Sequence, residues 1–344
     1  MVNLAVVGLG YWGPNLLRNF DQLPSAEVRL AVDRDEAQRS KIARLYPHIR
    51  VVDDYELVLK DPEIQAVVIA TEAASHYRLA KEALDAGKDV FVEKPITLDV
   101  ADAEDLVESA ERLGRVLMVG HLLVHHPAVK KLRGLMVGGE LGPIYYVYGN
   151  RVNLGEIRRD ESALWSLGPH DISVILYLLS QDPVEVAARG ESYIRDGIQD
   201  VVFVYLRFEG KTAAHIHLSW LDPHKVRKIT VVGSKKMVVF DDMEPTEKVK
   251  IYDKGAYRPD YDTYGEYVSL RFGDIHIPRI DGGEPLRGEC EHFIECVTGR
   301  KTPVTDGRDG LRVLRVLEAA QRSMMSGGAP VKLAQAPKLA PIAG

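Results

Sequence analysis

Three glycines near the amino terminus place the strongest constraint on what this chain can fold into. Gly8, Gly10 and Gly13 form a G-x-G-x-x-G pattern that directly follows the apolar run of residues 4–7. Where a buried strand turns into a helix through such glycines, the backbone can approach a pyrophosphate at the helix N-terminus, whose free N–H groups and dipole favour negative charge. The pattern therefore predicts a strand, a glycine-rich turn and a helix that together bind a dinucleotide.

An acidic residue follows at the distance that dinucleotide-binding folds use. Asp33 ends the next apolar run and lies about 20 residues past the last of the three glycines. Its carboxylate is expected to accept hydrogen bonds from the adenosine ribose, which favours NAD over NADP because a carboxylate repels a 2′-phosphate. Arg34 leaves NADP as a less favoured alternative, since a guanidinium pairs well with phosphate. Tyr11 and Trp12, inside the turn, are expected to contact the cofactor. The competing interpretation is a tight structural turn with a surface aspartate.

Length and composition exclude several classes of protein. A chain of 344 residues is longer than most single cores, so two domains are expected. With 46% hydrophobic and 27% charged residues it is typical of a globular protein, and a net charge of −6 argues against nucleic-acid partners. No run approaches the roughly 18 apolar residues of a membrane span, and Met1 leads almost directly into a strand, so we expect a cytoplasmic protein without a membrane partner. Cys290 and Cys296 lack zinc spacing, which predicts reduced thiols and no metal.

Residues 1–122 are predicted to form a Rossmann domain, a doubly wound α/β fold. Strand-like runs that are apolar on both faces alternate with helical patterns, and this arrangement indicates a parallel sheet with right-handed crossovers. Helices are expected at residues 75–86, with Ser75 as N-cap, and at 99–113, ended by Gly114. The expected strands cover residues 4–7, 28–32, 66–70, 90–92 and 116–119.

Residues 123–327 are predicted to form a second domain, of α+β type, that binds substrate and mediates oligomerisation. Alternating β-rich segments and the turns at Glu209-Gly210 and Gly233-Ser234 indicate an open-faced, mostly antiparallel sheet covered by helices on one side. Helices are expected at 171–179, 288–297 and 307–325, a loop at 252–283, and an extended or disordered tail at 328–344. The expected strands cover residues 144–152, 184–193, 200–208, 212–220, 228–232, 237–241 and 248–252.

Glu93-Lys94-Pro95 follows the strand expected at residues 90–92, at the carboxyl edge where doubly wound sheets bind their ligands. A lysine near an oxidised nicotinamide ring experiences like charge and partial desolvation. Both effects lower its pKa and let it exchange protons with a substrate hydroxyl. The alternative for Lys94 is a solvated lysine paired with Glu93.

Together with the glycine pattern, this tripeptide resembles the Glu-Lys-Pro motif of the Gfo/Idh/MocA family of sugar and polyol dehydrogenases, and the resemblance covers nearly the whole chain. It implies an NAD-dependent oxidoreductase that acts on CH–OH groups, with a Rossmann domain, a domain built on a large open sheet, and homodimers or homotetramers that form through that sheet. Thr71 and His76 match the family's Ala-Thr-Pro-x-x-x-His loop along the dinucleotide, although Glu72 replaces the proline. His76 could instead be a helix-start residue without a ligand. His121, after the strand expected at residues 116–119, is expected to face the nicotinamide side.

The family's Asp-x-Gly-x-His pattern maps onto Ser166-x-Gly168-x-His170, so the histidine is kept and the aspartate is lost. An imidazole, with an ordinary pKa near 6.5, can take a hydroxyl proton at neutral pH. Because serine cannot act as an ionised base, the proton role is expected to fall on His170 and Lys94. Gly168-Pro169 is expected to turn the chain into a helix, with His170 in its first turn and Asp171 capping it or orienting His170. The alternative for His170 is a buried core histidine.

The stretch from Trp165 to Asp171 looks most like the WlbA and GnnA branch of the family, which oxidises C3 of UDP-linked N-acetylhexosamines or their uronates. Trp165 and Ser166 are then expected to contact the sugar, and Arg158, Arg159 or Arg151 to bind the diphosphate. A dehydrogenase of a free sugar or an inositol-like polyol remains an alternative. A non-catalytic dinucleotide sensor is a third candidate, because a fold does not determine a function.

Overall fold

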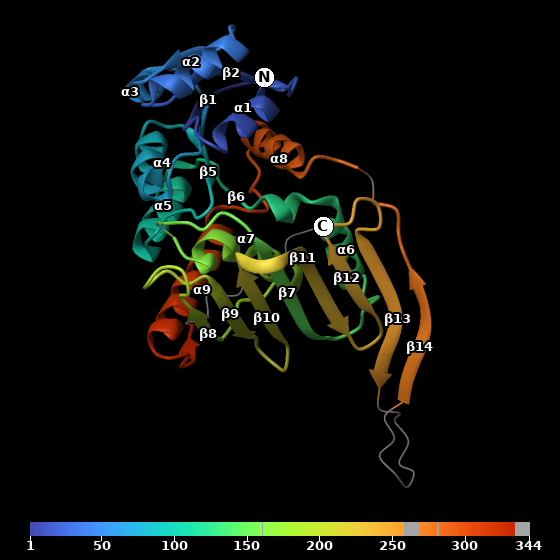
Figure 1. The fold of residues 1–344 in the computed structure, drawn as a ribbon. Coiled ribbons are helices and arrows are strands. Elements are labelled where there is room, and N and C mark those ends of the chain that lie inside the picture. The colour runs from blue at the N-terminus through green and yellow to red at the C-terminus, as the bar shows by residue number, and fades with distance from the viewer. Residues whose placement is uncertain (160, 258–268, 281, 334–344) are drawn as a thin grey trace. The chain divides into compact units, whose positions relative to one another are not determined.

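The computed structural model describes residues 1–159, 161–257, 269–280 and 282–333 (Figure 1). The chain divides into two compact units, one formed by Met1–His126 with Gly283–Leu314 and the other by Pro127–Gly282 with Arg315–Gly344. A segment from the carboxyl-terminal third therefore belongs to the first unit. The domain boundaries expected at residues 122 and 327 stay a prediction.

The described residues of the first unit form a six-stranded parallel sheet in the order β3-β2-β1-β4-β5-β6. This order is that of dinucleotide-binding folds, in which the direction of strand addition reverses between β1 and β4. The predicted parallel Rossmann sheet is confirmed, although the short β3 was not predicted. The strands are β1 (Val2–Val7), β2 (Ala26–Val32), β3 (Arg50–Val52), β4 (Ala66–Ile69), β5 (Asp89–Glu93) and β6 (Leu117–Gly120).

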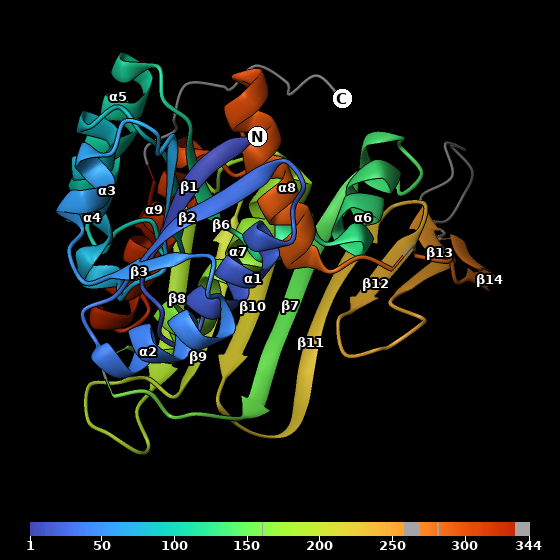
Figure 2. The ribbon, with the colours of Figure 1, turned by 90° about the horizontal axis from the view of Figure 1, so that it is seen from above.

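Helices cover both faces of this sheet, with α1 and α8 on one side and α4 and α5 on the other (Figure 2). Three phenylalanines fill the core under α1 and α8: Phe20, Phe91 and Phe293 meet edge to face with ring centroids 5.7–6.2 Å apart. The helical segments of this unit are α1 (Gly13–Asp21), α2 (Glu36–Leu45), α3 (Glu56–Lys60), η1 (Ala73–Ser75), α4 (His76–Asp85), α5 (Val100–Leu113), η2 (Leu122–His125) and α8 (Pro285–Gly299).

Two helix ends in this unit show what local sequence signals can and cannot determine. The Asp99 carboxylate accepts a hydrogen bond from the Ala101 N–H at 2.8 Å, and Gly114 ends α5 with φ +62°, as predicted. Ser75 occupies the N-cap position of α4, as predicted, but its side chain makes no capping hydrogen bond. Its hydroxyl donates to the carbonyl of Glu72, within the 3-10 turn η1 that precedes α4.

The described residues of the second unit form a nine-stranded sheet in the order β14-β13-β12-β11-β7-β10-β9-β8-β15. All neighbours pair antiparallel except β7 and β10, and the predicted hairpins at Glu209-Gly210 and Gly233-Ser234 are confirmed. The strands are β7 (Ile144–Leu154), β8 (Glu185–Glu191), β9 (Val201–Arg207), β10 (Ala213–Ser219), β11 (Leu221–Gly233), β12 (Met237–Asp241), β13 (Val249–Tyr257), β14 (Ser269–His276) and β15 (Val331–Lys332).

One face of this sheet packs against α6 (Pro127–Val137), α7 (Ala163–Leu179) and the carboxyl-terminal part of α9 (Gly307–Met325) (Figure 1). Residues along β9 alternate accordingly: Val202, Val204 and Leu206 are buried, whereas Phe203 and Tyr205 are exposed on the other face. The predicted open-faced, mostly antiparallel sheet with helices on one side is confirmed.

The predicted turn at Gly168-Pro169 was wrong, because α7 begins at Ala163 and contains Pro169. Proline removes one helical hydrogen bond, but most of α7 is buried, and that packing outweighs the loss. Gly168 also helps close packing, since a Cβ there would lie 3.3 Å from the Leu317 side chain.

The loop predicted at 252–283 was wrong in part, because β13 continues to Tyr257 and pairs with β14. Residues 258–268 and 281 of that prediction lie outside the described residues. Of the predicted tail, β15 pairs with β8, and residues 334–344 likewise lie outside the described part. None of the helices in the described ranges has the length and apolar character that crossing a membrane requires.

Candidate active site

The glycines of the turn after β1 have two different structural roles. A Cβ on Gly8, whose φ is +93°, would lie 2.7 Å from the Ala70 backbone, and one on Gly13 would lie 1.8 Å from the Gly8 carbonyl oxygen. A Cβ on Gly10, in contrast, would meet nothing described within 4 Å. Close packing therefore requires Gly8 and Gly13, and Gly10 leaves bare backbone beside open space. At the start of α1, Trp12 provides no side-chain cap and no acidic residue lies in the first turn, so this helix end suits a phosphate.

Asp33 lies beside this turn, at the carboxyl end of β2. Its carboxylate accepts hydrogen bonds from the Leu9 N–H at 2.6 Å and from the Asp35 N–H at 2.8 Å. The side chain is thereby held at the edge of the glycine turn, which is where a ribose-binding carboxylate belongs. Arg34 is exposed. These residues fit a dinucleotide.

His76 fastens the loop after β4 to the Glu-Lys-Pro segment. This buried imidazole lies 2.8 Å, through Nδ1, from the Pro95 carbonyl oxygen and 3.1 Å, through Nε2, from that of Thr71. Burial lowers the pKa of His76, so the ring is neutral and donates through one nitrogen. Glu72 has φ −65°, the value that proline would impose, so the loop reaches this conformation without the family's proline.

The Glu-Lys-Pro segment is tied directly to the glycine turn. Trp12 Nε1 donates to Glu93 Oε1 at 2.6 Å, and the Lys94 N–H donates to Glu93 Oε2 at 3.2 Å. Burial raises the pKa of Glu93 to about 7, partly offset by the Lys94 charge and by these hydrogen bonds. Lys94 follows β5, is half-buried, and is joined to Pro95 by a cis peptide bond. Sequence reasoning missed the Trp12–Glu93 contact, which joins residues 81 positions apart.

His121 follows β6 and is 2% exposed. Neither of its ring nitrogens has a hydrogen-bond partner among the described residues. Burial, reinforced by the Lys94 charge, lowers the pKa of His121 to about 3. The imidazole is therefore neutral, and its ring nitrogens can form hydrogen bonds with a ligand.

Sequence reasoning also missed Glu289, a buried carboxyl on α8 whose Oε1 has no hydrogen-bond partner within the described ranges. Burial and the charge of Glu93 raise its pKa well above the ordinary value. A signal was present in the sequence, because Leu286, Cys290 and Phe293 lie three before, one after and four after Glu289 and form the apolar face of the helix. An acidic residue on that apolar face, such as Glu289, is therefore expected to be buried.

In the second unit, α7 carries Trp165, Ser166, His170 and Asp171. Asp171 lies in the helix interior and forms a buried ion pair with Arg151 of β7, so the expectation that it caps a helix was wrong. His170 lies beyond the first turn of α7 and is half-buried, and its carbonyl accepts a hydrogen bond from Ser173 at 3.0 Å.

Two other predicted substrate residues of the second unit, Trp165 and Arg158, have polar partners within the protein. The Trp165 indole donates to Gln321 at 3.2 Å. Arg158 and Arg159 are exposed between β7 and α7, and Arg158 lies 3.6 Å from the Glu161 carboxylate. The roles of all these residues toward a substrate stay predictions.

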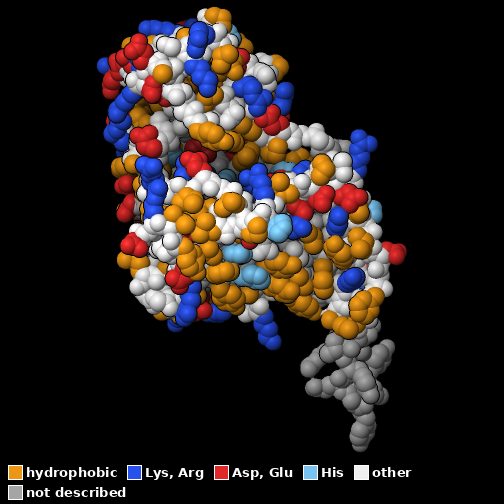
Figure 3. Space-filling view, in the orientation of Figure 1, with side chains coloured by type: hydrophobic (Ala, Val, Ile, Leu, Met, Phe, Trp, Pro, Cys, Tyr) orange, Lys and Arg blue, Asp and Glu red, His pale blue; other side chains and the backbone are white. Residues whose placement is uncertain are grey.

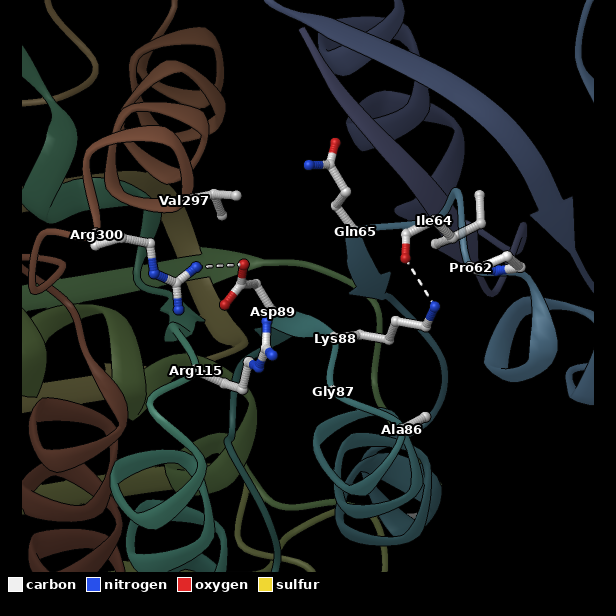
Figure 4. A pocket seen from close by; sticks show the side chains of 10 residues that line it. All are labelled: Pro62, Ile64, Gln65, Ala86, Gly87, Lys88, Asp89, Arg115, Val297 and Arg300. Atoms are coloured by element: carbon white, nitrogen blue, oxygen red, sulfur yellow. Dashed lines mark hydrogen bonds and ion pairs between the residues drawn. The ribbon is translucent and has the colours of Figure 1, made fainter.

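A pocket of about 490 Å³ lies in the first unit, at the amino ends of β4 and β5 (Figure 4). Three of its charged side chains, Lys88, Asp89 and Arg300, have partners within the protein. Arg300 forms an ion pair with Asp89 at 2.8 Å, and the Lys88 ammonium donates to the carbonyls of Asp61 and Ile64. Doubly wound sheets bind their ligands at the opposite, carboxyl ends of the strands. The glycine turn and Lys94 therefore form the candidate site.

Comparison with known proteins identifies the family of this chain. Residues 2–121 match the model of an oxidoreductase family with an NAD-binding Rossmann fold, and residues 135–333 match the model of that family's C-terminal alpha/beta domain. The chain belongs to the Gfo/Idh/MocA family of oxidoreductases. It is an NAD-dependent enzyme, as predicted.

Characterised relatives act on different substrates. The scyllo-inositol 2-dehydrogenase (NAD(+)) of Bacillus subtilis strain 168 is 27% identical over 351 residues, which cover 96% of each chain. The UDP-N-acetylglucosamine 3-dehydrogenase of Acidithiobacillus ferrooxidans is 26% identical over 310 residues, or 90% of this chain and 93% of that one. A solved structure of the enzyme from that organism has a TM-score of 0.79 at 23% identity, covers 94% of this chain and 98% of its own, and shows the shared fold.

Proposed function

We propose that this enzyme oxidises C3 of a UDP-linked N-acetylhexosamine, or of its uronate, with NAD⁺. The observation that carries the proposal is the position of Lys94, which follows β5 at the carboxyl edge of the sheet and is anchored to the glycine turn through Glu93 and Trp12. The similarity to a UDP-N-acetylglucosamine 3-dehydrogenase over 90% of the chain supports the choice of sugar.

Bound NAD⁺ supplies the hydride acceptor for this reaction. We propose that His170 accepts the proton of the substrate hydroxyl and that Lys94 assists it and stabilises the developing alkoxide. Ser166 replaces the family's aspartate and contributes hydrogen bonding without a negative charge. In this reaction the C3–H bond of the substrate supplies the hydride and the hydroxyl O–H bond supplies the proton that the protein accepts, which leaves a ketone at C3.

The residues proposed to hold the cofactor surround the glycine turn. The pyrophosphate is assigned to the turn itself, and the ribose to Asp33 with Arg34 nearby. The ring nitrogens of His121 have no hydrogen-bond partner among the residues that the structure describes, which supports a ligand contact there. The proposed cofactor residues are Gly8, Gly10, Tyr11, Trp12, Gly13, Asp33, Arg34, Thr71, His76, Glu93, Lys94 and His121.

For the diphosphate of the substrate, Arg158 and Arg159 are better candidates than Arg151. Both are exposed, whereas the guanidinium of Arg151 is buried and already paired with Asp171. Trp165 and Asp171 are also proposed to serve substrate binding. Asp171 is buried, so its proposed role is to hold α7 in place and not to touch the substrate.

A second candidate function is the oxidation of an inositol-like polyol, which the similarity to scyllo-inositol 2-dehydrogenase over 96% of the chain favours. Formation of NADH separates the two when UDP-N-acetylglucosamine, its uronate, free N-acetylglucosamine, myo-inositol and scyllo-inositol are compared. We expect kcat/KM for a UDP-sugar to exceed that for the free sugar by about 100-fold, since two charge-assisted hydrogen bonds to the diphosphate contribute about 3 kcal/mol. Preference for a polyol would contradict the first proposal, and NAD⁺ binding without turnover of any substrate would favour a sensor.

We also propose that the enzyme assembles as a homodimer or homotetramer through the open face of its sheet. Apolar and histidine side chains gather on this face (Figure 3), where Tyr148 stacks on His215 with ring centroids 5.2 Å apart and Phe203 stacks on His217 at 4.5 Å. A large apolar surface of this kind is typical of an interface. A cytoplasmic location is proposed as well, supported by the buried free thiols Cys290 and Cys296.

A further inference from the structure

The pocket of about 490 Å³ at the amino ends of β4 and β5 has no part in the proposed reaction (Figure 4). It belongs entirely to the first unit and is lined by the segment before β4, the turn between α4 and β5, the residue Arg115 after α5, and the end of α8. Its volume lies in the range of small-molecule sites. The hydrogen-bonding groups in its wall show what kind of ligand it fits.

Asp89 is the acidic residue among the described residues that line the pocket, and its carboxylate is already satisfied. The side chain is buried, and its Oδ1 accepts the Val116 N–H at 2.8 Å. Its Oδ2 accepts the Arg300 guanidinium, also at 2.8 Å. The charge of Asp89 is therefore balanced inside the protein, and both of its oxygens have donors before any ligand binds.

Lys88 contributes a buried positive charge that has neutral partners. Its side chain is 5% exposed, and its ammonium donates to the carbonyl oxygens of Asp61 at 2.6 Å and Ile64 at 2.8 Å. These two bonds use two of the three N–H groups of an ammonium. In the part of the chain that the structure describes, no carboxylate forms a salt bridge with Lys88, although the Asp61 charge acts on it from further away.

Arg115 is a second cation in the same wall. It is exposed, and its Nη2 lies 3.6 Å from the position that a Cβ on Gly87 would take. Its guanidinium has neither a hydrogen bond nor an ion pair with any residue in the described ranges. The Arg115 charge adds to burial in lowering the pKa of Lys88, so the two cations repel each other. An anion bound between them would relieve this repulsion.

The other polar groups of the wall that lack partners are also donors. Arg300 uses Nη1 for Asp89 and Nη2 for the Gly114 carbonyl, which leaves its Nε–H. Gln65 accepts the Asn3 N–H through Oε1, which leaves its NH₂ group. The unused side-chain hydrogen bonds of this pocket are therefore donors, and its charge without the balanced Asp89–Arg300 pair is positive. Such a wall suits an anion.

We propose that this pocket binds a phosphate monoester of a small ring-shaped or apolar group, at a site separate from the active site. The planar guanidinium of Arg115 supplies paired donors to the phosphate, and Lys88 supplies positive charge. The apolar side chains of Ile64, Ala86 and Val297 line the same pocket and are assigned to the organic group. The inference does not depend on the substrate proposed above.

The position of the pocket separates it from the dinucleotide. Asp89 begins β5, and Lys94 directly follows the last residue of that strand. At a rise of about 3.3 Å per residue, the strand places these two positions about 16 Å apart. A ligand in the pocket should therefore bind together with NAD⁺ and not compete with it.

Ligand-observed NMR of phenyl phosphate with the full-length protein, in saturating NAD⁺, tests this site. We expect phenyl phosphate to bind with a Kd of about 1 mM or tighter, and phenol, which keeps the ring and lacks the charge, at least about 10-fold more weakly. Inorganic phosphate, which lacks the ring, should displace phenyl phosphate only at higher concentration. Absence of saturable binding, or equal binding of phenol, would overturn the proposal.

Variants locate the site. Arg115→Gln removes an exposed cation and should weaken phenyl phosphate at least about 10-fold, because a charge-assisted hydrogen bond is lost. Arg44→Gln, which removes an exposed arginine of α2, is the matched control and should change the Kd by less than about 2-fold. Equal effects of the two variants would contradict the assignment, since they would show attraction by overall charge alone.

A second pair of variants separates this pocket from the proposed substrate site. Ala86→Phe, at an exposed position, places a ring in the pocket and should block phenyl phosphate. The double variant Arg158→Gln with Arg159→Gln should leave the binding unchanged. If that double variant abolishes the binding while Ala86→Phe does not, the ligand occupies the substrate site, and the second site is refuted without any consequence for the proposed reaction.

Discussion

At Gly13 the backbone has no space for a side chain, because a Cβ would lie 1.8 Å from the Gly8 carbonyl oxygen. We therefore expect Gly13→Ala to lower the free energy of unfolding by about 1–3 kcal/mol, the usual range for overpacking. Chemical denaturation measures this change.

Gly10→Ala is the matched control, since nothing described lies within 4 Å of a Cβ at that position. Its free energy of unfolding should change by less than about 0.5 kcal/mol. Its affinity for NAD⁺ should nevertheless fall, because the methyl group occupies the open side of the turn. An equal loss of stability in both variants would contradict the roles assigned to the two glycines.

Individual site residues could be predicted where the signal is local in sequence. The glycine spacing, Asp33 and the Glu-Lys-Pro segment lie at strand ends that are visible as apolar runs. The Trp12–Glu93 bond and the neighbourhood of Glu289 depend on segments brought together only by folding. Arg151 illustrates the same limit, because its pairing with Asp171 joins a strand to a helix and cannot be inferred from either segment alone.

At the scale of elements, the Arg151–Asp171 pair joins β7 to α7. Arg151→Met would leave Asp171 as an unpaired buried acid, and breaking a buried pair in this way costs about 3–5 kcal/mol. The double variant Arg151→Met with Asp171→Asn should recover a large part of this loss, because no buried charge remains. Denaturation curves that show a loss below about 1 kcal/mol for Arg151→Met would contradict a structural role for the pair.

Strands with a clear hydrophobic period could be predicted to within a few residues, as β12 shows by matching its expected range of 237–241. Several elements could not, and α7 and β14 show the reasons. The start of α7 was missed because Gly168-Pro169 has the local signature of a turn, whereas apolar burial along the helix decides the outcome. β14 was missed because it lies in a stretch rich in Asp, Tyr, Arg and Gly that suggested a loop, whereas its pairing with β13 makes it a strand.

At the scale of the whole molecule, the open face of the sheet predicts self-association. Phe203 is 55% exposed on that face, so Phe203→Glu should dissociate the native dimer or tetramer by placing a charge in an apolar interface. Light scattering with size-exclusion chromatography measures the mass. Leu45→Glu on α2, at a leucine that is 61% exposed, is the control and should not alter the assembly. A monomeric native protein would contradict the proposed interface.

The central claim, that Lys94 serves the chemistry and not the binding of the cofactor, is tested most directly by Lys94→Met. Turnover of the best substrate and the Kd for NAD⁺ are measured side by side, with Lys60→Met, an exposed lysine on α3, as the control. We expect turnover to fall by about 100-fold or more while the Kd changes by less than about 3-fold, because proton transfer by a positioned side chain contributes about 10²- to 10⁴-fold. Turnover equal to that of the native enzyme, or a loss explained entirely by weaker NAD⁺ binding, would contradict the account.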